Sequence, residues 1–282
     1  MGIVKNQHYV PRFYLKYFAS SGSKIFCYDK ITNKVIETNI NNIATEKCFY
    51  DLDKSLAENE GIEDIQHLEK QYSYIESEFA PYYAEFLDRL KLQKFKITEC
   101  DRDKIASYLS IQIERTKNHR EESAKLETAF NKALNVWDIS VQNVPGYNTG
   151  VRSKRDIHTE NILFGDNFRE SIKEVIKGHI WIIFENNTNI PFLTSDNPII
   201  TIPHKEDNIR SYRGLNSEGV QIAFPLSPKY ILILAERKTY KKIIATENQI
   251  EKLNATLFIE YYNSHIEYYA LRQVYSNKNI FI

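Results

Sequence analysis

The sequence predicts an α+β fold in which an N-terminal β-hairpin, a helical middle and a C-terminal sheet follow one another. Early β-prone runs flank a polar connector, apolar residues in the middle recur every three to four positions, and two late runs are almost continuously apolar. Strands and helices do not alternate as βαβ units, which favours α+β. We expect a single domain over 1–282, with a helical subregion at about 62–177 and a sheet subregion at about 178–282 that the hairpin joins.

The N-terminal hairpin is predicted from two short runs of β-branched and aromatic residues. Lys24–Asp29 and 34–38 flank a polar connector that contains Asp and Asn, as the two arms of a hairpin do. A further short strand is expected at 48–51. The first long helix is predicted from Ile62 onward, because apolar side chains recur there at spacings of three and four. Pro81 is expected to kink or restart this helix, since proline lacks the backbone donor.

Three more helices are expected in the middle of the chain. One runs from Asp101, its expected cap, to about Arg120. The others are expected at 126–137 and 156–177. Gly178 follows the last of these and suits a left-handed C-cap.

The sheet subregion is predicted from the runs 179–185 and 230–236, which are almost continuously apolar, as strands buried on both faces should be. The segments between and after them predict a mixed or antiparallel sheet with one late helix. They are strands at 191–194, 198–202 and 220–224, a helix at 246–263 and a last strand at 268–276.

The composition excludes several classes of protein. The chain of 282 residues carries 37 basic and 37 acidic side chains, so its formal net charge of zero excludes a histone-like basic binder. Hydrophobic residues at 42% and charged residues at 26% argue against disorder. Glycine is scarce, and the sequence contains no Rossmann, Walker or GxSxG pattern. We therefore expect no cofactor.

The sequence also limits the compartment and the use of metals. No apolar stretch approaches the roughly 20 residues of a membrane-spanning helix, and no secretory signal is recognisable. Cys27, Cys48 and Cys100 are widely spaced and form no CxxC pair, so we expect reduced thiols in a cytoplasmic protein. The histidines form no HExxH or HxH motif, and no metal site is predicted.

The most distinctive stretch is 6–18, in which a histidine, an arginine and aromatic residues surround a proline. His8 can exchange protons near neutral pH, and Arg12 can bind a phosphate or carboxylate through two parallel hydrogen bonds. The alternative is an aromatic plug on the core, in which His8 is hydrogen-bonded and has no chemical role.

Residues 7–15, Gln-His-Tyr-Val-Pro-Arg-Phe-Tyr-Leu, closely resemble the opening motif of a bacterial family catalogued as domain of unknown function 4238. Later segments resemble that family in the same order, so the resemblance spans nearly the whole chain. Where it implies Arg-Thr-Pro, the chain has Arg115-Thr116-Lys117, which predicts that this helix continues. The later segments are 28–30, 42–44, 49–50, 112–120, the Thr-Ser-Asp-Asn-Pro motif at 194–198, 224–228, Asn263, Ala270 and 274–276.

The helix expected from Asp101 changes from apolar to polar along one face. Ile105, Tyr108 and Leu109 mark its buried stripe, and the same spacing continues into polar residues. Buried polar groups need partners, so these residues either bond to loops or line a pocket, and we favour the pocket. The polar residues are Gln112, Thr116 and His119, with Arg115 at the edge.

Asp196 and Asn197 lie between two predicted strands and precede Pro198, so their side chains are expected at a strand end. Asp196 is a candidate general base or a stabiliser of a developing cation. Equally, the two side chains can form an Asx-type turn that satisfies backbone donors. Both alternatives stay open.

We expect these motifs to meet in one cavity between the helical middle and the sheet, lined by His8, Arg12, Gln112, Arg115, Asp196 and Asn197. A bidentate pair of Asp196 with Arg115 or Arg12 is expected to lower the pKa of that carboxyl group. The expected catalytic residues are His8, Asp196 and Asn197. The expected substrate-binding residues are Gln7, Tyr9, Arg12, Gln112, Arg115, Thr116, His119, Arg120 and Asn263.

The leading functional hypothesis is a metal-independent hydrolase that acts on a nucleic acid or nucleotide in bacterial defence against phage. Arginines suit phosphates, aromatic side chains stack on bases, and one Asp with one His is enough to hydrolyse an N-glycosidic or phosphodiester bond. A base-excising DNA glycosylase is the concrete version. The alternative is a non-catalytic sensor or binding module whose polar pocket recognises a small ligand or a phage component. No membrane partner is expected.

Overall fold

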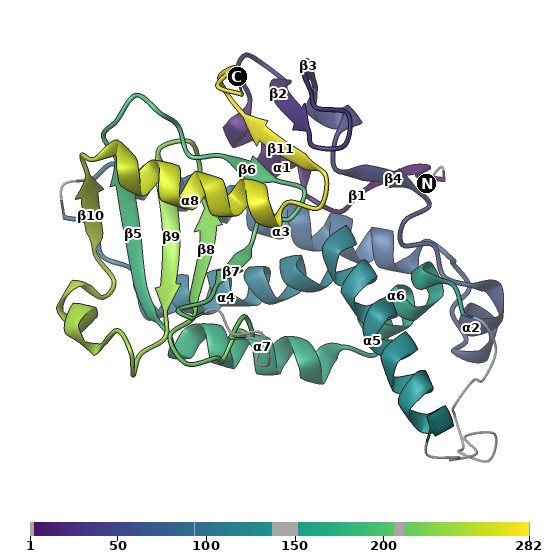
Figure 1. Cartoon of the computed structure of the whole chain (residues 1–282). Coiled ribbons are helices and arrows are strands. Elements are labelled where there is room, and N and C mark those ends of the chain that lie inside the picture. The colour runs from purple at the N-terminus through teal and green to yellow at the C-terminus, as the bar shows by residue number, and fades with distance from the viewer. Residues whose placement is uncertain (1–2, 93, 137–151, 206–211, 282) are drawn as a thin grey trace.

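A mixed five-stranded sheet forms the centre of the structure, a computed structural model that describes residues 3–92, 94–136, 152–205 and 212–281 (Figure 1). The strand order is β10-β5-β9-β8-β7. β10 runs parallel to β5, and the other neighbours are antiparallel. The predicted α+β fold is thereby confirmed. The strands are β5 (Ile180–Asn186), β7 (Ile200–Ile202), β8 (Gln221–Pro225), β9 (Tyr230–Ala235) and β10 (Ile250–Leu253).

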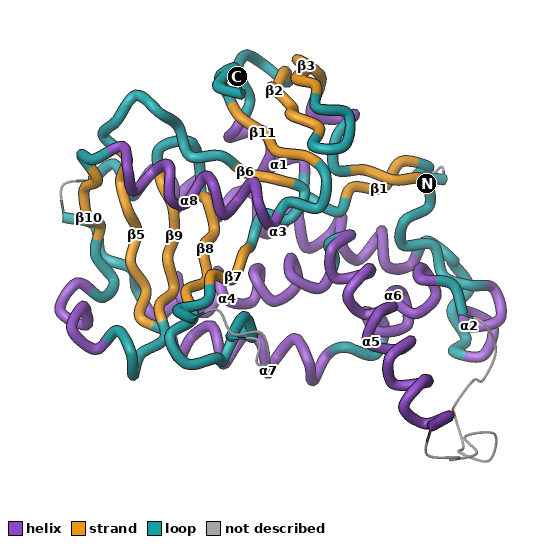
Figure 2. Tube along the Cα trace, in the orientation of Figure 1, coloured by secondary structure: helices purple, strands orange, loops and turns teal. Residues whose placement is uncertain are grey.

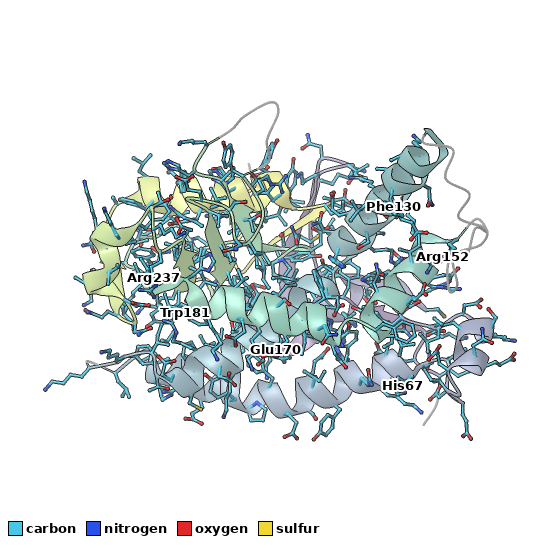
Figure 3. All side chains as sticks on the ribbon, turned by 90° about the horizontal axis from the view of Figure 1, so that it is seen from below. His67, Phe130, Arg152, Glu170, Trp181 and Arg237 are labelled. Atoms are coloured by element: carbon cyan, nitrogen blue, oxygen red, sulfur yellow. The ribbon has the colours of Figure 1, made fainter. Side chains whose placement is uncertain are left out.

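The central sheet is covered by helices on both faces (Figure 2). Ile231 and Ile233 of β9 pack in one apolar cluster with α8, whereas Leu232 and Leu234 pack in another with α4 and α7. Because side chains alternate across a strand, burial on both faces requires a continuous apolar run. Trp181 lies against α7, where its indole donates to the carbonyl of Ile176 at 3.0 Å (Figure 3). The helices are α8 (Thr256–Tyr269) on one face and α4 (Glu99–Glu114) and α7 (Asp166–Gly178) on the other.

The first long helix, α3 (His67–Arg89), does not restart at Pro81. Pro81 has no backbone N–H to donate to the carbonyl of Ser77, one turn earlier in the helix. Both residues are exposed. Water can therefore satisfy that carbonyl. Tyr72 and Tyr83 are buried on either side of the proline and hold both halves of α3 on the core. A short helix that the sequence did not predict, α2 (Lys54–Asn59), precedes it.

The segment that is predicted as one helix from Asp101 to about Arg120 forms parts of two helices, α4 and α5. α4 begins at a capping box formed by Thr98 and Asp101. α5 (Lys117–Val136) starts after Thr116, whose hydroxyl accepts the N–H of His119 at 3.2 Å. The prediction that the first helix continues past residue 117 is therefore wrong, because Thr116 caps a new helix. The helix predicted separately at 126–137 is part of α5 as far as the described residues extend.

The predicted helix 156–177 is also divided. α6 (Lys154–Leu163) and α7 are separated at Gly165, which packs against the side chain of Glu114. A Cβ atom at this position would collide with the Glu114 carboxylate. Glycine therefore lets the junction of α6 and α7 approach the end of α4 more closely than a residue with a side chain would allow.

The left-handed cap predicted at Gly178 is wrong. Gly178 ends α7 with a negative φ, and His179 is extended with φ −74° and ψ 163°, which leads directly into β5. Arg237 Nε donates to the carbonyl of Gly178 at 3.2 Å, and Arg102 Nη2 donates to that of His179 at 3.0 Å. These two arginines satisfy the carbonyl groups of the residues that lead from α7 into β5.

The helix predicted at 246–263 is wrong in its first half. Asn248 has a φ of 64° and donates its backbone N–H to the carbonyl of Trp181 at 2.7 Å, which places the following residues beside β5 as β10. The last strand, β11 (Gln273–Ser276), is shorter than predicted, because Tyr268 and Tyr269 complete α8.

The N-terminal hairpin is confirmed and belongs to a second sheet with the order β3-β2-β11-β6. Asp29 lies opposite Lys34 at the turn. The strand predicted at 48–51 does not form, because Cys48 has a left-handed φ of 51°. A separate antiparallel pair joins β1 and β4. The strands are β1 (Asn6–His8), β2 (Lys24–Asp29), β3 (Lys34–Asn39), β4 (Thr45–Lys47) and β6 (Thr194–Ser195).

The N-terminal aromatic motif docks into the core through α1 (Arg12–Leu15). The Tyr14 hydroxyl donates to the carbonyl of Pro225 and bonds to the Thr194 hydroxyl, both at 2.7 Å, and its ring stacks on Phe224. This docking fixes the chain on either side of Pro11 and carries β1 against the ends of α3 and α4.

Candidate active site

Arg115 stands at the centre of a polar cluster at the C-terminal end of α4. Its side chain is only 2% exposed. Nη1 pairs with Oε1 of Glu76 at 2.9 Å, Nη2 donates to the carbonyl of His8 at 2.7 Å, and Nε donates to the Tyr50 hydroxyl at 3.3 Å. The guanidinium also stacks on Tyr72, 4.4 Å from the ring centre. Burial opposes the charge, but Tyr50 and Glu76 outweigh it and raise the pKa of Arg115.

Two carboxyl groups approach Arg115 from α3. Glu69 and Glu76 are seven residues apart, so they lie on the same face of the helix two turns apart. Burial raises the pKa of Glu69 to about 7, Arg115 opposes the rise and Glu76 adds to it. A carboxyl group that titrates near neutral pH can both donate and accept a proton there.

His8 and Arg12 complete the charged part of the cluster. Burial, together with the neighbouring charges of Arg12 and Arg115, lowers the pKa of His8 to about 4. The imidazole is therefore neutral at pH 7 and can accept as well as donate a hydrogen bond. Arg12 is exposed at the start of α1, where its Nη1 donates a long hydrogen bond of 3.4 Å to Oδ1 of Asn41. It is the cation that a ligand arriving from solvent can reach.

Several buried polar atoms of this cluster have no hydrogen-bond partner among the described residues. Folded proteins leave few such atoms, and several together indicate a place where water or a ligand is expected. Tyr108 and Gln112 lie on the face of α4 that carries Arg115. The atoms are Nε2 of His8, the hydroxyls of Tyr72 and Tyr108, and Oε1 of Gln112.

Gln7, Tyr9 and Gln112 frame the cluster through backbone contacts. Gln7 is completely buried; its Nε2 donates to Asp51 at 2.6 Å, and its Oε1 accepts the N–H of Tyr50 at 2.6 Å. Gln112 Nε2 donates to the carbonyl of Tyr9 at 3.0 Å. These bonds position β1, and with it His8, against α4.

Arg120 lies on α5 and faces β4 rather than the cluster. Nη1 donates to Glu46 at 2.8 Å, Nη2 donates to the carbonyl of Phe49 at 3.1 Å, and the guanidinium lies over the Phe49 ring. Its contacts join α5 to the N-terminal strands.

Asp196 directly follows β6 and is buried, and both of its carboxylate oxygens accept backbone hydrogen bonds. Oδ1 accepts from Leu271 at 2.9 Å, and Oδ2 accepts from Arg272 at 2.8 Å and from Gln273 at 2.9 Å. Neither Arg115 nor Arg12, both of which the structure describes, pairs with it, so the predicted bidentate ion pair is wrong. Burial raises the pKa of Asp196 despite the three backbone bonds, where the sequence predicts a lowered value. The geometry favours the structural alternative, in which Asp196 satisfies backbone donors.

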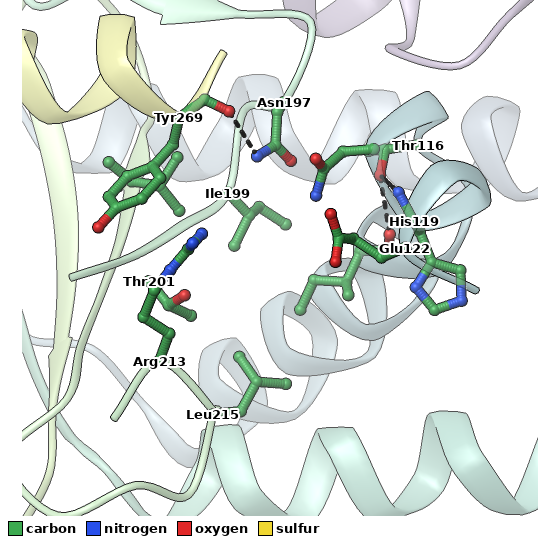
Figure 4. Close-up of a pocket in the computed structure, with 12 residues that line it drawn as sticks. Thr116, His119, Glu122, Asn197, Ile199, Thr201, Arg213, Leu215 and Tyr269 are labelled. Atoms are coloured by element: carbon green, nitrogen blue, oxygen red, sulfur yellow. Dashed lines mark hydrogen bonds between the residues drawn. The ribbon is translucent and has the colours of Figure 1, made fainter. Parts of the chain in front are cut away.

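Asn197 lies in a different place, in a cavity of about 170 Å³ that also contains Thr116 and His119 (Figure 4). We name it the Asn197 cavity. Its wall is formed by the start of α5, the segment from β6 to β7, the segment before β8 and the end of α8. The described residues that line it are Ile113, Thr116, Asn118, His119, Glu122, Asn197, Ile199, Ile200, Thr201, Arg213, Leu215 and Tyr269.

The predicted site residues are thus divided between two regions. His8, Arg12, Gln112 and Arg115 gather in the polar cluster, whereas Thr116, His119 and Asn197 line the Asn197 cavity. Asn263 belongs to neither: its Oδ1 accepts the N–H of Leu193 and its Nδ2 donates to the carbonyl of Pro191, both at 2.9 Å. The six residues that the sequence predicts to line one cavity therefore do not lie together: of the six, only Asn197 lines the Asn197 cavity.

The sequence analysis missed Glu69 and Glu76. Their signal was present in the spacing, because Glu69, Tyr72 and Glu76 recur at three and four positions on one face of the first long helix. Only the apolar positions of that helix were used to predict its buried face. Two glutamates on the same helix face as a tyrosine indicate a polar site.

Comparison with protein-family models assigns the chain to a family. The model described as protein of unknown function (DUF4238) matches residues 6–279. The chain belongs to this family. The resemblance that the N-terminal motif indicates is therefore confirmed over nearly the whole chain. No curated protein and no solved structure matches it.

Two further findings concern the described part of the chain. None of its helices combines the length and the apolar character that crossing a bilayer requires. Within the same residues, no group of three or more His, Cys, Asp or Glu side chains is arranged to hold a metal ion.

Proposed function

We propose that this family member is a metal-independent hydrolase that acts on a nucleic acid or nucleotide at the polar cluster around Arg115. The observation that carries the proposal is the placing of Glu69, a carboxyl group with a pKa of about 7, beside Arg115 and Glu76. Two carboxyl groups whose environments differ in this way are the usual basis for acid and base roles in one site.

Hydrolysis of an N-glycosidic bond is the reaction that this arrangement supports best. Protonated Glu69 donates its proton to the departing base as the bond from the sugar carbon to nitrogen breaks. The carboxylate of Glu76 stabilises the positive charge that develops on the sugar, as in other glycoside cleavage. Water adds to the sugar carbon and returns a proton to Glu69, so that a free base and a sugar hydroxyl are formed.

The remaining groups of the cluster have roles in binding. Arg12 is exposed and can pair with a phosphate at the edge of the site. His8 is neutral at pH 7 and has a buried, unpaired Nε2 that can bond to a base or sugar. Asp196 and Asn197, the catalytic candidates of the sequence analysis, take no part in this version of the proposal.

In its most specific form, the proposal is a base-excising glycosylase of phage DNA. The test is incubation of the purified protein with modified and unmodified phage DNA and with RNA, followed by assays for released base, abasic sites and strand breaks. Glu69→Gln should lower the rate by about 100-fold or more, and the loss of activity as pH rises through about 7, where Glu69 gives up its proton, should disappear. Glu63→Gln, an exposed change nearby, is the matched control. Full activity of Glu69→Gln, or no product from any substrate, contradicts the proposal.

A non-catalytic binding module is the second candidate, and the Asn197 cavity is the observation that favours it. In that case Glu69→Gln and the wild-type protein should bind a nucleic acid or other partner equally well without turnover. Asn197→Ala, in the wall of that cavity, should then weaken binding in proportion to any loss of cellular effect.

A further inference from the structure

A second cavity, of about 530 Å³, lies between the β2–β3 hairpin, α8 and the C-terminal segment. We name it the hairpin cavity. Phe281 stacks on Tyr28 with the ring centres 5.6 Å apart, which holds the C-terminal segment beside the hairpin (Figure 1). The volume lies within the range of about 300–1,000 Å³ that is usual for small-molecule sites. None of the described residues that line it belongs to the polar cluster around Arg115, so it is separate from the site proposed for hydrolysis.

One wall of the hairpin cavity is a face of α8 that carries two carboxylates. Glu260 and Glu267 are seven residues apart, so they lie on the same face of the helix, about 10 Å apart along its axis. Among the described residues, neither carboxylate forms an ion pair. Lys30 reaches the end of α8, but its Nζ donates to three backbone carbonyls there rather than to a carboxylate. Two negative charges at a fixed spacing therefore face the cavity without a counter-charge from the described chain.

A neutral acceptor lies between the two charges. Ser264 is four residues after Glu260 and three before Glu267, so it shares their face of α8, and it lines the cavity. Its hydroxyl donates to the carbonyl of Tyr261 at 2.8 Å, and its oxygen can still accept a hydrogen bond. The helix thus presents three acceptors in a row, with a negative charge at each end.

The walls opposite α8 are largely apolar. Val35 of β3 lies opposite Tyr28 in the hairpin register, so the two side chains are on one face of the sheet. Ile280 and Phe281 line the cavity from the C-terminal segment. No lysine or arginine is among the described residues of its lining. A ligand that suits these walls has positive charges at two separated places and apolar surface between them.

A single metal ion does not suit this arrangement. The ligands of a bound metal converge on one point, within about 2.6 Å even for calcium. In the described part of the chain, no group of three or more His, Cys, Asp or Glu side chains is arranged in that way. The charges must therefore be met by two cationic groups joined by a chain.

We propose that the hairpin cavity binds a linear polyamine of the spermidine type. The terminal ammonium groups pair with Glu260 and Glu267, and the middle ammonium group donates to the Ser264 hydroxyl. The methylene groups lie on Val35 and Phe281, where their burial is favourable. The proposal does not depend on hydrolase activity.

Three probes of similar length separate the charges of the ligand. Spermidine carries three, 1,8-diaminooctane lacks the middle one, and octylamine has one ammonium group only. Calorimetric titration of the full-length protein at low salt should show binding of spermidine and of 1,8-diaminooctane. Octylamine should bind about fivefold more weakly than 1,8-diaminooctane, because it forms one exposed ion pair instead of two.

Substitutions on α8 make the test specific. Glu260→Gln and Glu267→Gln should each remove most of the preference for 1,8-diaminooctane over octylamine. Ser264→Ala should weaken the binding of spermidine and leave that of 1,8-diaminooctane unchanged. Glu260 and Ser264 are exposed and Glu267 is half-buried, so these changes should not unfold the protein. Glu58→Gln makes the same charge change on an exposed residue elsewhere and should leave all three affinities unchanged.

Three results overturn the proposal. The first is the absence of binding of spermidine and 1,8-diaminooctane up to about 10 mM, beyond which affinity is too weak to be specific. The second is a preference for 1,8-diaminooctane over octylamine that survives undiminished in Glu260→Gln or in Glu267→Gln. The third is an unchanged affinity for spermidine in Ser264→Ala, which contradicts the choice of a polyamine. None of them bears on hydrolysis at Glu69, which is measured with nucleic-acid substrates.

Discussion

Arg115 and Glu76 form an ion pair in which Nη1 and Oε1 are 2.9 Å apart, and the arginine side chain is almost completely removed from solvent. The pair joins α4 to α3. The same guanidinium reaches β1 through the carbonyl of His8, so one side chain connects three elements that are far apart in the sequence. The sequence predicts instead that Asp196 pairs with Arg115 or Arg12.

Arg115→Lys should lower the free energy of unfolding by about 3 kcal/mol, because buried groups that the guanidinium bonds to are left without a hydrogen-bond partner. A lysine keeps the charge but cannot reach Glu76, the carbonyl of His8 and the Tyr50 hydroxyl together. Urea unfolding measures the change. Glu76 is 25% exposed, so Glu76→Gln should cost less. A change below about 0.5 kcal/mol in Arg115→Lys, the range of ordinary surface substitutions, contradicts the central role of this pair.

Asp196→Asn should destabilise the protein by about 2–4 kcal/mol, because an amide nitrogen would replace one acceptor of the three backbone N–H groups. Any hydrolytic activity per folded molecule should stay unchanged. Thermal unfolding and single-turnover rates measure the two effects. Asp88→Asn, in an exposed pair with Lys91, is the control and should cost less than 1 kcal/mol. A selective loss of rate with normal stability would return Asp196 to the catalytic group.

The elements that could be predicted are those whose signal lies in their own residues. β5 and β9 are almost continuously apolar because both of their faces are covered. β10 was missed because Ile250–Leu253 has two charged residues at its centre and is a strand only by pairing with β5. The helix breaks at Thr116 and Gly165 were missed for a similar reason. They depend on a cap and on a close approach to Glu114, and neither shows in hydrophobic spacing.

The candidate site could be predicted only in part for the same physical reason. Arg115 and Gln112 follow from helical spacing, and His8 and Arg12 stand out in a distinctive motif. The pKa of Glu69 results from burial in the folded chain and from the charges of Arg115 and Asp51, which are distant in the sequence, so no local pattern reveals it. Asp196 does not pair with Arg115, because it bonds to the backbone at the start of β11 in the sheet β3-β2-β11-β6, which the local sequence does not show.

Glu114 should make stability depend on pH. Burial raises its pKa from 4.5 to about 7, although Arg169 donates to it at 2.6 Å; the carboxylate is 1% exposed, so burial dominates. The folded state then binds more protons than the unfolded state between these values. Stability from this group is complete below about pH 4.5 and is lost as pH rises through 7, by about 3 kcal/mol in total.

Glu114→Gln removes that dependence, so its free energy of unfolding relative to wild type should rise from pH 4.5 to pH 8. The difference between the two proteins is the quantity to measure, by denaturant unfolding at each pH. His158 acts in the opposite direction, because burial lowers its pKa to about 3, but its contribution is present in both proteins and cancels. A difference that is constant with pH contradicts the raised pKa of Glu114.

Lys30 and Asp196 hold the same turn between α8 and β11, the lysine through carbonyl groups and the aspartate through N–H groups. Lys30→Met keeps the length of the side chain and removes its donors, so it should cost about 1–2 kcal/mol. Because both side chains fix one turn, Lys30→Met and Asp196→Asn together should cost less than the sum, by at least about 0.5 kcal/mol. Lys30→Met with Asp88→Asn, on α3, should be additive. Additivity in both pairs would mean that the turn is held by each side chain independently. The Lys30 Nζ atom donates to the carbonyls of Glu267, Tyr268 and Ala270 at 2.6, 3.2 and 2.9 Å.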